Sequence, residues 1–330
     1  METSITNKSA WARFVDKNIF IQFFDVTLRG CAQVMFQNNP LTGLLFFIAI
    51  FTGAFLEKIP EVAFGCLLGT VIATLTAYIS KLDIDSLRSG LYGYNGCLVG
   101  VALPAFLENT PFTWLSVILG SIVSVIATIS LMDFLRSWKV SALTAPFVLV
   151  SWTILLASYS FLGIKGVSLP EPTLPHQYIE PIGHHPSIDL VVVVFRGVSE
   201  VFLLNSVIVG VIFTIGLAVS SIWAAIFAIL GSLLAFSIAS LLKADIASIH
   251  AGLYSFSAVL TAIALGSTFN KPSWRGLIYA IIGIIFTVFV QGALDVVLKP
   301  FGIPTLTMPF VLASWLFLIP NQDIMPNHRR

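Results

Sequence analysis

The residues with the clearest capacity for chemistry are polar side chains inside long apolar stretches, at matching places in the two halves of the chain. Gln33 follows Arg29 by four residues, and Glu200 follows Arg196 by four. A carboxylate at the centre of a bilayer costs roughly 2.5–3.5 kcal/mol, so Glu200 must be paired or face water. Arg196, on the same helix face, could be the partner. Because Gln33 is neutral, the two positions share only hydrogen-bond acceptance, which favours contact with a solute over a simple ion pair.

These matching places exist because the chain contains an internal repeat. Residues 143–152 (LTAPFVLVSW) return as 306–315 (LTMPFVLASW), with eight of ten positions identical. Residues 90–94 return as 252–256, and residues 29–34 as 196–201. Membrane proteins with such duplications usually place their substrate between the halves.

The composition indicates a bilayer protein. Hydrophobic residues make up 57% of the 330 residues and charged residues only 10%, with a mean hydropathy of +0.95. A soluble globular protein does not have these values. The net charge of +1 suggests neither a nucleic-acid partner nor a strongly charged substrate.

Long charge-free runs mark the elements that must position the polar side chains. Each run is near the roughly 20 residues that a helix needs to cross the hydrocarbon. The runs are 40–56, 62–80, 109–132, 140–164, 251–270, 276–294 and 300–321. Residues 201–242 are too long for one helix, and Ser220-Ser221 predicts a break into two. The runs are apolar throughout and do not alternate between apolar and polar residues, which favours helices over strands.

Basic residues near both ends predict that both termini are cytoplasmic. These residues are Lys8, Arg13, Lys17, Arg329 and Arg330. The proline-rich segment 165–189 predicts an external linker, so the two halves would be inverted relative to each other. The expected parts are a cytoplasmic segment 1–19, a first repeat 20–164, the linker 165–189, a second, inverted repeat 190–320 and a cytoplasmic tail 321–330.

One region in each half does not read as a simple span. Residues 82–90 carry three charges before the glycine-rich stretch 90–100, and residues 242–252 are the counterpart. Such segments predict short or broken helices, whose free backbone groups should line a cavity. Close helix packing at small residues is the structural alternative.

Several of these motifs together resemble the urea transporter family. They are the segment 39–43 (NPLTG), the stretch 90–100 containing Tyr92-Gly93-Tyr94-Asn95, and the paired blocks 143–152 and 306–315. The resemblance runs from about residue 20 to about residue 320. It implies an all-α polytopic protein with about five spanning helices and one tilted, half-membrane helix in each half. It also implies a homotrimer, with urea passing through a pore at the pseudo-two-fold axis of each protomer.

The resemblance also implies which residues touch urea, a flat, neutral, dipolar molecule. Repeat-related pairs would supply acceptor oxygens, apolar neighbours, the walls of a slot and midpoint hydroxyls. The acceptor oxygens would come from Gln33 and Glu200, whose apolar neighbours are Val34 with Val201 and Phe36 with Leu203. The walls of the slot would be Tyr94 with Phe256 and Leu98 with Leu260. The midpoint hydroxyls would be those of Thr144 and Thr307.

Plain structural roles remain open for the same residues. The aromatic and leucine side chains would ordinarily be packing residues, and intramembrane threonines often bond to carbonyls of their own helix. The paired aspartates Asp83 and Asp245, and Asp133 and Asp295, are expected to form caps and interface pairs. Cys31, Cys66 and Cys97 lack metal-type spacing and are expected to be buried free thiols. The pair His184-His185 is only weak evidence for metal, so no metal or cofactor is expected.

The predicted function is facilitated, channel-like diffusion of urea across the cell membrane, for a bacterial protein the inner membrane. The alternatives are an ion-coupled secondary transporter, or a channel for another small neutral amide, ammonia or water. An enzyme is disfavoured because the sequence has no His-Glu-x-x-His motif and no plausible serine–histidine pair. The partners expected are urea, the lipid bilayer and two further copies of the chain.

Overall fold

The computed structural model describes residues 10–15, 18–175 and 189–320, and in these ranges it forms helices and no strand. The first half contains α1 (Ala10–Val15), α2 (Ile19–Gln33), α3 (Pro40–Leu56), α4 (Pro60–Ile79), α5 (Ile84–Arg88), α6 (Tyr94–Phe106), α7 (Pro111–Leu135), the 3₁₀ turn η1 (Arg136–Trp138) and α8 (Ala145–Ala157).

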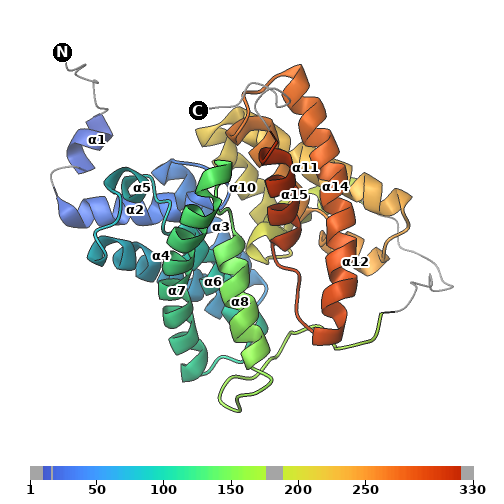
Figure 1. Ribbon diagram of the computed structural model, residues 1–330, viewed down its shortest axis with the longest axis horizontal. Coiled ribbons are helices and arrows are strands. Elements are labelled where there is room, and N and C mark those ends of the chain that lie inside the picture. The colour runs from blue at the N-terminus through green and yellow to red at the C-terminus, as the bar shows by residue number, and fades with distance from the viewer. Residues whose placement is uncertain (1–9, 16–17, 176–188, 321–330) are drawn as a thin grey trace.

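The second half repeats this order. It contains α9 (Leu190–Ser199), the 3₁₀ turn η2 (Glu200–Phe202), α10 (Val207–Ser220), α11 (Ile222–Leu241), α12 (Ile246–Ala251), α13 (Phe256–Ile263), the π-helical turn η3 (Ala264–Thr268), α14 (Trp274–Leu298), the 3₁₀ turn η4 (Lys299–Phe301) and α15 (Met308–Leu318). Figure 1 shows the two halves side by side, with α3 and α10 in contact between them.

Left-handed backbone residues occur at matching positions in the two halves. Gly90 has a φ of 80° and Gly252 a φ of 81°. A Cβ atom at Gly90 would lie 2.5 Å from the amide nitrogen of Gly30, and one at Gly252 would lie 2.8 Å from that of Gly197. Only glycine therefore suits the turn that leads into α6 or α13. The non-glycine matches include Phe36 with Leu203, and Leu143 with Leu306. The duplication seen in the sequence is also a duplication of backbone conformation.

Local sequence explains where the helices begin. Asn39 accepts from the amides of Leu41 and Thr42 ahead of Pro40, and Thr110 accepts from the amide of Thr113 ahead of Pro111. A side-chain cap followed by proline is a strong helix start. The predicted break after Ser220 is confirmed: α10 ends there, and the Ser221 side chain caps α11.

Not every charge-free run forms one long helix. Run 140–164 is helical only over α8, and run 300–321 only over α15, because Leu143 and Leu306 are left-handed and proline follows three residues later. Run 251–270 begins with the end of α12 and a turn, so α13 starts only at Phe256. The single long helices expected from these runs were therefore wrong.

Four described helices are long and apolar enough to cross a membrane: α4, α7 with η1, α11, and α14 with η4. A fifth candidate is α9 with η2 and α10, a pair bent by 75°. The other apolar helices, of 10–17 residues, are α3, α6, α8, α13 with η3, and α15. The expectation of five spanning helices and a tilted one in each half stays a prediction.

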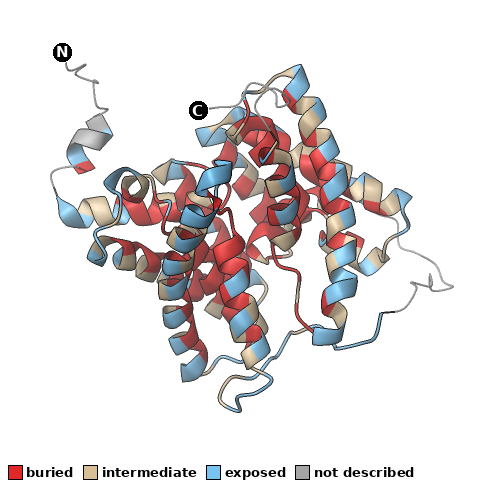
Figure 2. Ribbon diagram, viewed as in Figure 1, coloured by how far each residue is buried: buried red, intermediate tan, exposed pale blue. Residues whose placement is uncertain are grey.

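Burial follows the arrangement expected for a protein in lipid. Figure 2 shows buried residues concentrated on the inner faces of the helices and exposed residues on the outer faces. The exposed faces carry large apolar side chains, including Leu115, Leu119 and Ile126 of α7 and Ile278, Ile282 and Phe289 of α14. Polar side chains such as Thr128, Thr287 and Gln291 point inward. Apolar outer surfaces with polar interiors suit lipid rather than water as the surrounding solvent.

The two short helices predicted in the irregular regions are present. Asp83 accepts from the amide of Ser86 at 2.9 Å to cap α5, and Asp245 accepts from the amide of Ser248 at 2.8 Å to cap α12. The Ser86 amide lowers the pKa of the exposed Asp83 carboxyl. The capping role expected for these two aspartates is confirmed.

Candidate functional site at the centre of the repeat

Two threonines meet where the halves of the protein touch. The hydroxyl oxygens of Thr144 and Thr307 are 2.6 Å apart, and both side chains are buried. Each residue stands immediately before a helix, α8 or α15. Neither hydroxyl therefore bonds to a carbonyl of its own helix, which was the structural alternative.

Two tryptophans make reciprocal contacts around this threonine pair. The indole Nε1 of Trp152 donates to the carbonyl of Pro304 at 2.8 Å, and Nε1 of Trp315 donates to the carbonyl of Ser141 at 3.0 Å. Each tryptophan thus contacts the other half at the repeat-related carbonyl, which is the signature of two-fold symmetry. An approximate two-fold axis passes close to the threonines.

A narrow cavity lies next to this axis and takes its walls from both halves. Its volume is about 10 Å³, about the minimum that one water molecule needs. The lining includes six of the residues predicted to touch the solute: Leu98, Glu200, Val201, Leu203, Phe256 and Thr307. It also includes Val101, Phe147 and Leu306, which the sequence analysis did not select. The surface that faces this cavity is apolar, and the polar atoms of Glu200 and Thr307 are bonded to Asn205 and Thr144 behind it.

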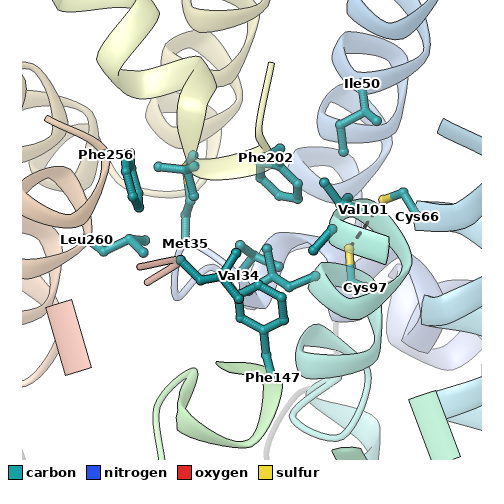
Figure 3. Packing of buried hydrophobic residues seen from close by; sticks show 14 of the residues in the cluster. Val34, Met35, Ile50, Cys66, Cys97, Val101, Phe147, Phe202, Phe256 and Leu260 are labelled. Carbon is teal, nitrogen blue, oxygen red and sulfur yellow. Dashed lines mark hydrogen bonds between the residues drawn. The ribbon is translucent and has the colours of Figure 1, made fainter. Parts of the chain in front are cut away.

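Figure 3 shows how apolar side chains from the two halves approach one another near the cavity. Phe256 and Leu260 come from α13 of the second half, and Val34 and Phe147 come from the first half. Phe256 and Leu260 are 5% and 0% exposed, so little free space separates the halves at this level. The packing is that of a constriction rather than an open pore.

The chain matches the family model described as Urea transporter over residues 24–322. This chain belongs to the urea transporter family. It is 29% identical over 327 residues to Urea transporter 1 of Ovis aries, covering 94% of this chain and 82% of that protein. Urea transporter 1 of Rattus norvegicus is 28% identical over 321 residues, with the same coverage. The resemblance inferred from the motifs is confirmed, and the chain is a polytopic membrane transporter rather than an enzyme.

In this member of the urea transporter family, Glu200 is held by an amide rather than by arginine. Nδ2 of Asn205 donates to Oε1 of Glu200 at 2.8 Å and to the carbonyl of Ala251 at 3.0 Å. Nη1 of Arg196 instead donates to the carbonyl of His250 at 3.3 Å. We call these four residues, Arg196, Glu200, Asn205 and Ala251, the Glu200 cluster. Arg196, the alternative partner for Glu200, donates elsewhere, and after the turn at η2 the hydrogen-bond partner of Glu200 is Asn205.

The matching place in the first half, the Gln33 cluster, consists of Asp25, Arg29, Gln33, Asn38 and Ser89. Nε2 of Gln33 donates to the carbonyl of Ser89 at 2.8 Å. Arg29 is anchored on both sides: its Nε is 2.7 Å from Oδ2 of Asp25, and its Nη1 donates to Oδ1 of Asn38 at 2.6 Å. A pocket of about 240 Å³ opens beside this cluster.

The other predicted residues do not line the cavity. The Tyr94 hydroxyl donates to the carbonyl of Leu143 at 2.6 Å, and the Phe36 ring packs edge-on against Phe269 and Phe310. Val34 and Leu260 belong to the core cluster around the cavity. Gln33 and Thr144 are engaged by Ser89 and Thr307. Direct contact of these residues with a solute stays a prediction.

The residues that the sequence analysis missed carried partial signals. Phe147 and Leu306 both lie inside the repeated ten-residue blocks, and Asn205 follows Glu200 at the spacing that separates Asn38 from Gln33. Comparing the polar positions around each acceptor, and not only the acceptors themselves, would have found Asn205. Val101 carries no such signal.

Proposed function

We propose that this protein carries urea passively across the membrane through the cavity between its two halves. Urea offers four N–H donors and one carbonyl, and its two flat faces can pack against apolar side chains. The observation that supports the proposal is a narrow apolar cavity between the halves, which is lined by Phe256, Leu98 and Leu203 and has Glu200 and Thr307 at its edge. Membership of the urea transporter family supports the same substrate.

The chemistry of the cavity fits weak, transient binding. Each hydrogen bond that urea loses on leaving water is worth about 1 kcal/mol net when it is replaced imperfectly. When the apolar walls shift, Glu200 and Thr307 would offer replacement acceptors, and a pore must not bind its solute so tightly that it is trapped. Because a cavity of about 10 Å³ holds about one water molecule, urea passes only when the apolar side chains shift.

The finer organisation is also proposed. Each half would cross the membrane with opposite orientation, both termini would be cytoplasmic, and three copies would form a trimer with one pore each. The residues that define the terminal segments 1–9 and 321–330, and part of the linker (176–188), lie outside the described residues. The reciprocal tryptophan contacts support a two-fold relation between the halves. An axis in the membrane plane is the arrangement typical of inverted repeats. A membrane of the cell, in a bacterium the inner one, is the proposed location.

The test is stopped-flow urea flux into proteoliposomes without any ion gradient, compared with empty liposomes and with glycerol as a size control. Rapid urea entry with little glycerol entry is expected. Folded protein that moves urea only when a sodium or proton gradient is imposed would instead establish an ion-coupled transporter, with Glu200 as the candidate coupling carboxylate.

A further inference from the structure

Three cysteine side chains from three helices meet in the first half. Cys31 comes from α2, Cys66 from α4 and Cys97 from α6, and their sulfur atoms all lie within 4.8 Å of one another. The sulfur atoms of Cys66 and Cys97 are 3.3 Å apart, as the dashed line in Figure 3 shows. All three thiols are free and fully buried, as expected from the sequence. Their positions along the chain give no sign that the fold brings them together. We call them the thiol cluster.

Close helix packing fixes the backbone around two of these cysteines. Helices α4 and α6 touch through glycines: Gly65 faces the carbonyl of Gly100, and Gly69 faces the carbonyl of Gly96, with no room for a Cβ atom. Cys66 and Cys97 lie within this glycine contact. A preorganised group of ligands loses little conformational entropy when it binds.

The surroundings restrict which ligand the cluster can hold. Thiolate sulfur is a soft ligand that selects soft, thiophilic centres. The thiol cluster belongs to the main hydrophobic core, where an uncompensated charge is costly. Three thiolates around a monovalent copper ion would bury two negative charges, and around zinc they would bury one. Three thiolates around trivalent arsenic leave no net charge.

We propose that the thiol cluster binds trivalent arsenic, taken up as arsenous acid, As(OH)₃. Three As–O bonds break and three As–S bonds form. Each thiol gives its proton to a departing hydroxyl, so the products are As(SR)₃ and three water molecules. No oxidation state changes, and no further reactant is required. The pyramidal arrangement of three sulfur atoms around arsenic matches three thiols that already lie near one another from three directions.

Access follows from the neighbours of the cluster. Leu98 and Val101 line the central cavity on the same helix as Cys97, and Figure 3 shows Val101 beside Cys66 and Cys97. The thiol cluster therefore lies one layer behind the cavity wall. Arsenous acid is small, neutral and polar, so it can reach that wall without the cost of moving a charge into the membrane. The binding itself does not depend on urea transport.

The experiment uses purified, reduced full-length protein in liposomes, incubated with sodium arsenite at neutral pH and then freed of unbound arsenic. Arsenic per chain is measured by mass spectrometry of the element, and its neighbours by X-ray absorption at the arsenic K edge. The protein should retain one arsenic atom per chain with three sulfur neighbours. Absence of retained arsenic, or a spectrum dominated by oxygen neighbours, would overturn the proposal without needing any variant.

Two variants sharpen the result, because the chain has only three cysteines. C31A/C66A/C97A has no thiol and should retain no arsenic. Cys31→Ala leaves the pair Cys66 and Cys97 and should bind at least about tenfold more weakly, since the third bond no longer forms within the same complex. Equal retention by the cysteine-free variant would show that the binding is not at thiols. Equal affinity of Cys31→Ala and the unaltered protein would show that three-thiol coordination is wrong.

Discussion

The Gln33 cluster and the Glu200 cluster occupy the same place in the two halves, but different residues donate the hydrogen bond to the repeat-related backbone carbonyl. The carbonyls of Ser89 and Ala251 are repeat-related, and each receives a side-chain amide. In the first half the amide belongs to Gln33 itself. In the second half Glu200 has no amide to donate, and Asn205 provides it while also holding the carboxylate.

The arginines differ in the same way. Arg29 is tied to Asp25 and Asn38, whereas Arg196 has a single long bond to His250 and an Nε atom without a partner. The first half therefore keeps its charge balanced within the cluster. In the second half, the hydrogen bond to the Glu200 carboxyl group comes from one neutral donor, Asn205. What the two halves preserve is the donor to the backbone carbonyl, and the residue that provides it is free to change.

Asn205→Leu is expected to have the largest effect on stability. It removes the amide that donates to both Glu200 and Ala251, and each buried acceptor left without its donor costs about 1–3 kcal/mol. Asn38→Leu, the matched change, should cost much less because Arg29 keeps its bond to Asp25. Unfolding temperatures of both variants in the same detergent measure the difference. Equal losses of unfolding temperature would mean that the Glu200 cluster depends on Asn205 no more than the Gln33 cluster depends on Asn38.

Replacing Glu200 separates charge from hydrogen bonding. Glu200→Gln keeps an acceptor for Asn205 and copies the first half, so urea flux should fall by less than about threefold, the equivalent of about 0.6 kcal/mol. Glu200→Leu removes the acceptor beside the cavity, and flux should fall by about tenfold or more, the equivalent of about 1.4 kcal/mol. Flux in proteoliposomes, corrected for the amount of inserted protein, is the measurement. If both variants lose the same flux, the negative charge matters more than the acceptor.

The midpoint threonines give a prediction about coupling between the halves. Thr144→Val or Thr307→Val alone leaves one buried hydroxyl without its partner and should cost about 1–3 kcal/mol. The double variant removes both hydroxyls and should be no worse than either single variant, because replacing both partners can be nearly neutral. A double-mutant cycle on the free energy of unfolding tests this. Additive losses would show that the hydroxyls do not bond to each other, and unchanged urea flux in the double variant would remove their proposed role in transport.

The smallest predicted effects test the two-fold relation itself. Trp152→Phe and Trp315→Phe each remove one hydrogen bond to the opposite half, worth about 1 kcal/mol. Because the two contacts are reciprocal, the two unfolding temperatures should fall by the same amount. Clearly unequal shifts would indicate that the halves meet asymmetrically at α8 and α15.

The sequence could predict the features that depend on local residue types. The sequence predicted the break at Ser220-Ser221, the caps at Asp83 and Asp245 and the duplicated blocks, because each of these features depends on residues that are adjacent in the sequence. The lining of the cavity by Phe256 and Thr307 was reached through the family resemblance. Val101 and the thiol cluster were not readable, since their neighbours come from helices that are distant in sequence. The pairing of Glu200 with Asn205 was missed because a regular helix would have placed Arg196 there, and η2 interrupts that helix.

The central claim is that urea passes through the cavity between the halves, and a cavity-filling variant tests it most directly. Leu203 lines the cavity, whereas Ile215 of α10 is 53% exposed on the outer surface. Stopped-flow urea flux should fall by about tenfold or more in Leu203→Trp, the equivalent of about 1.4 kcal/mol, and stay near that of the unaltered protein in Ile215→Trp. Equal flux through Leu203→Trp, Ile215→Trp and the unaltered protein, all folded and inserted, would mean that urea takes another path.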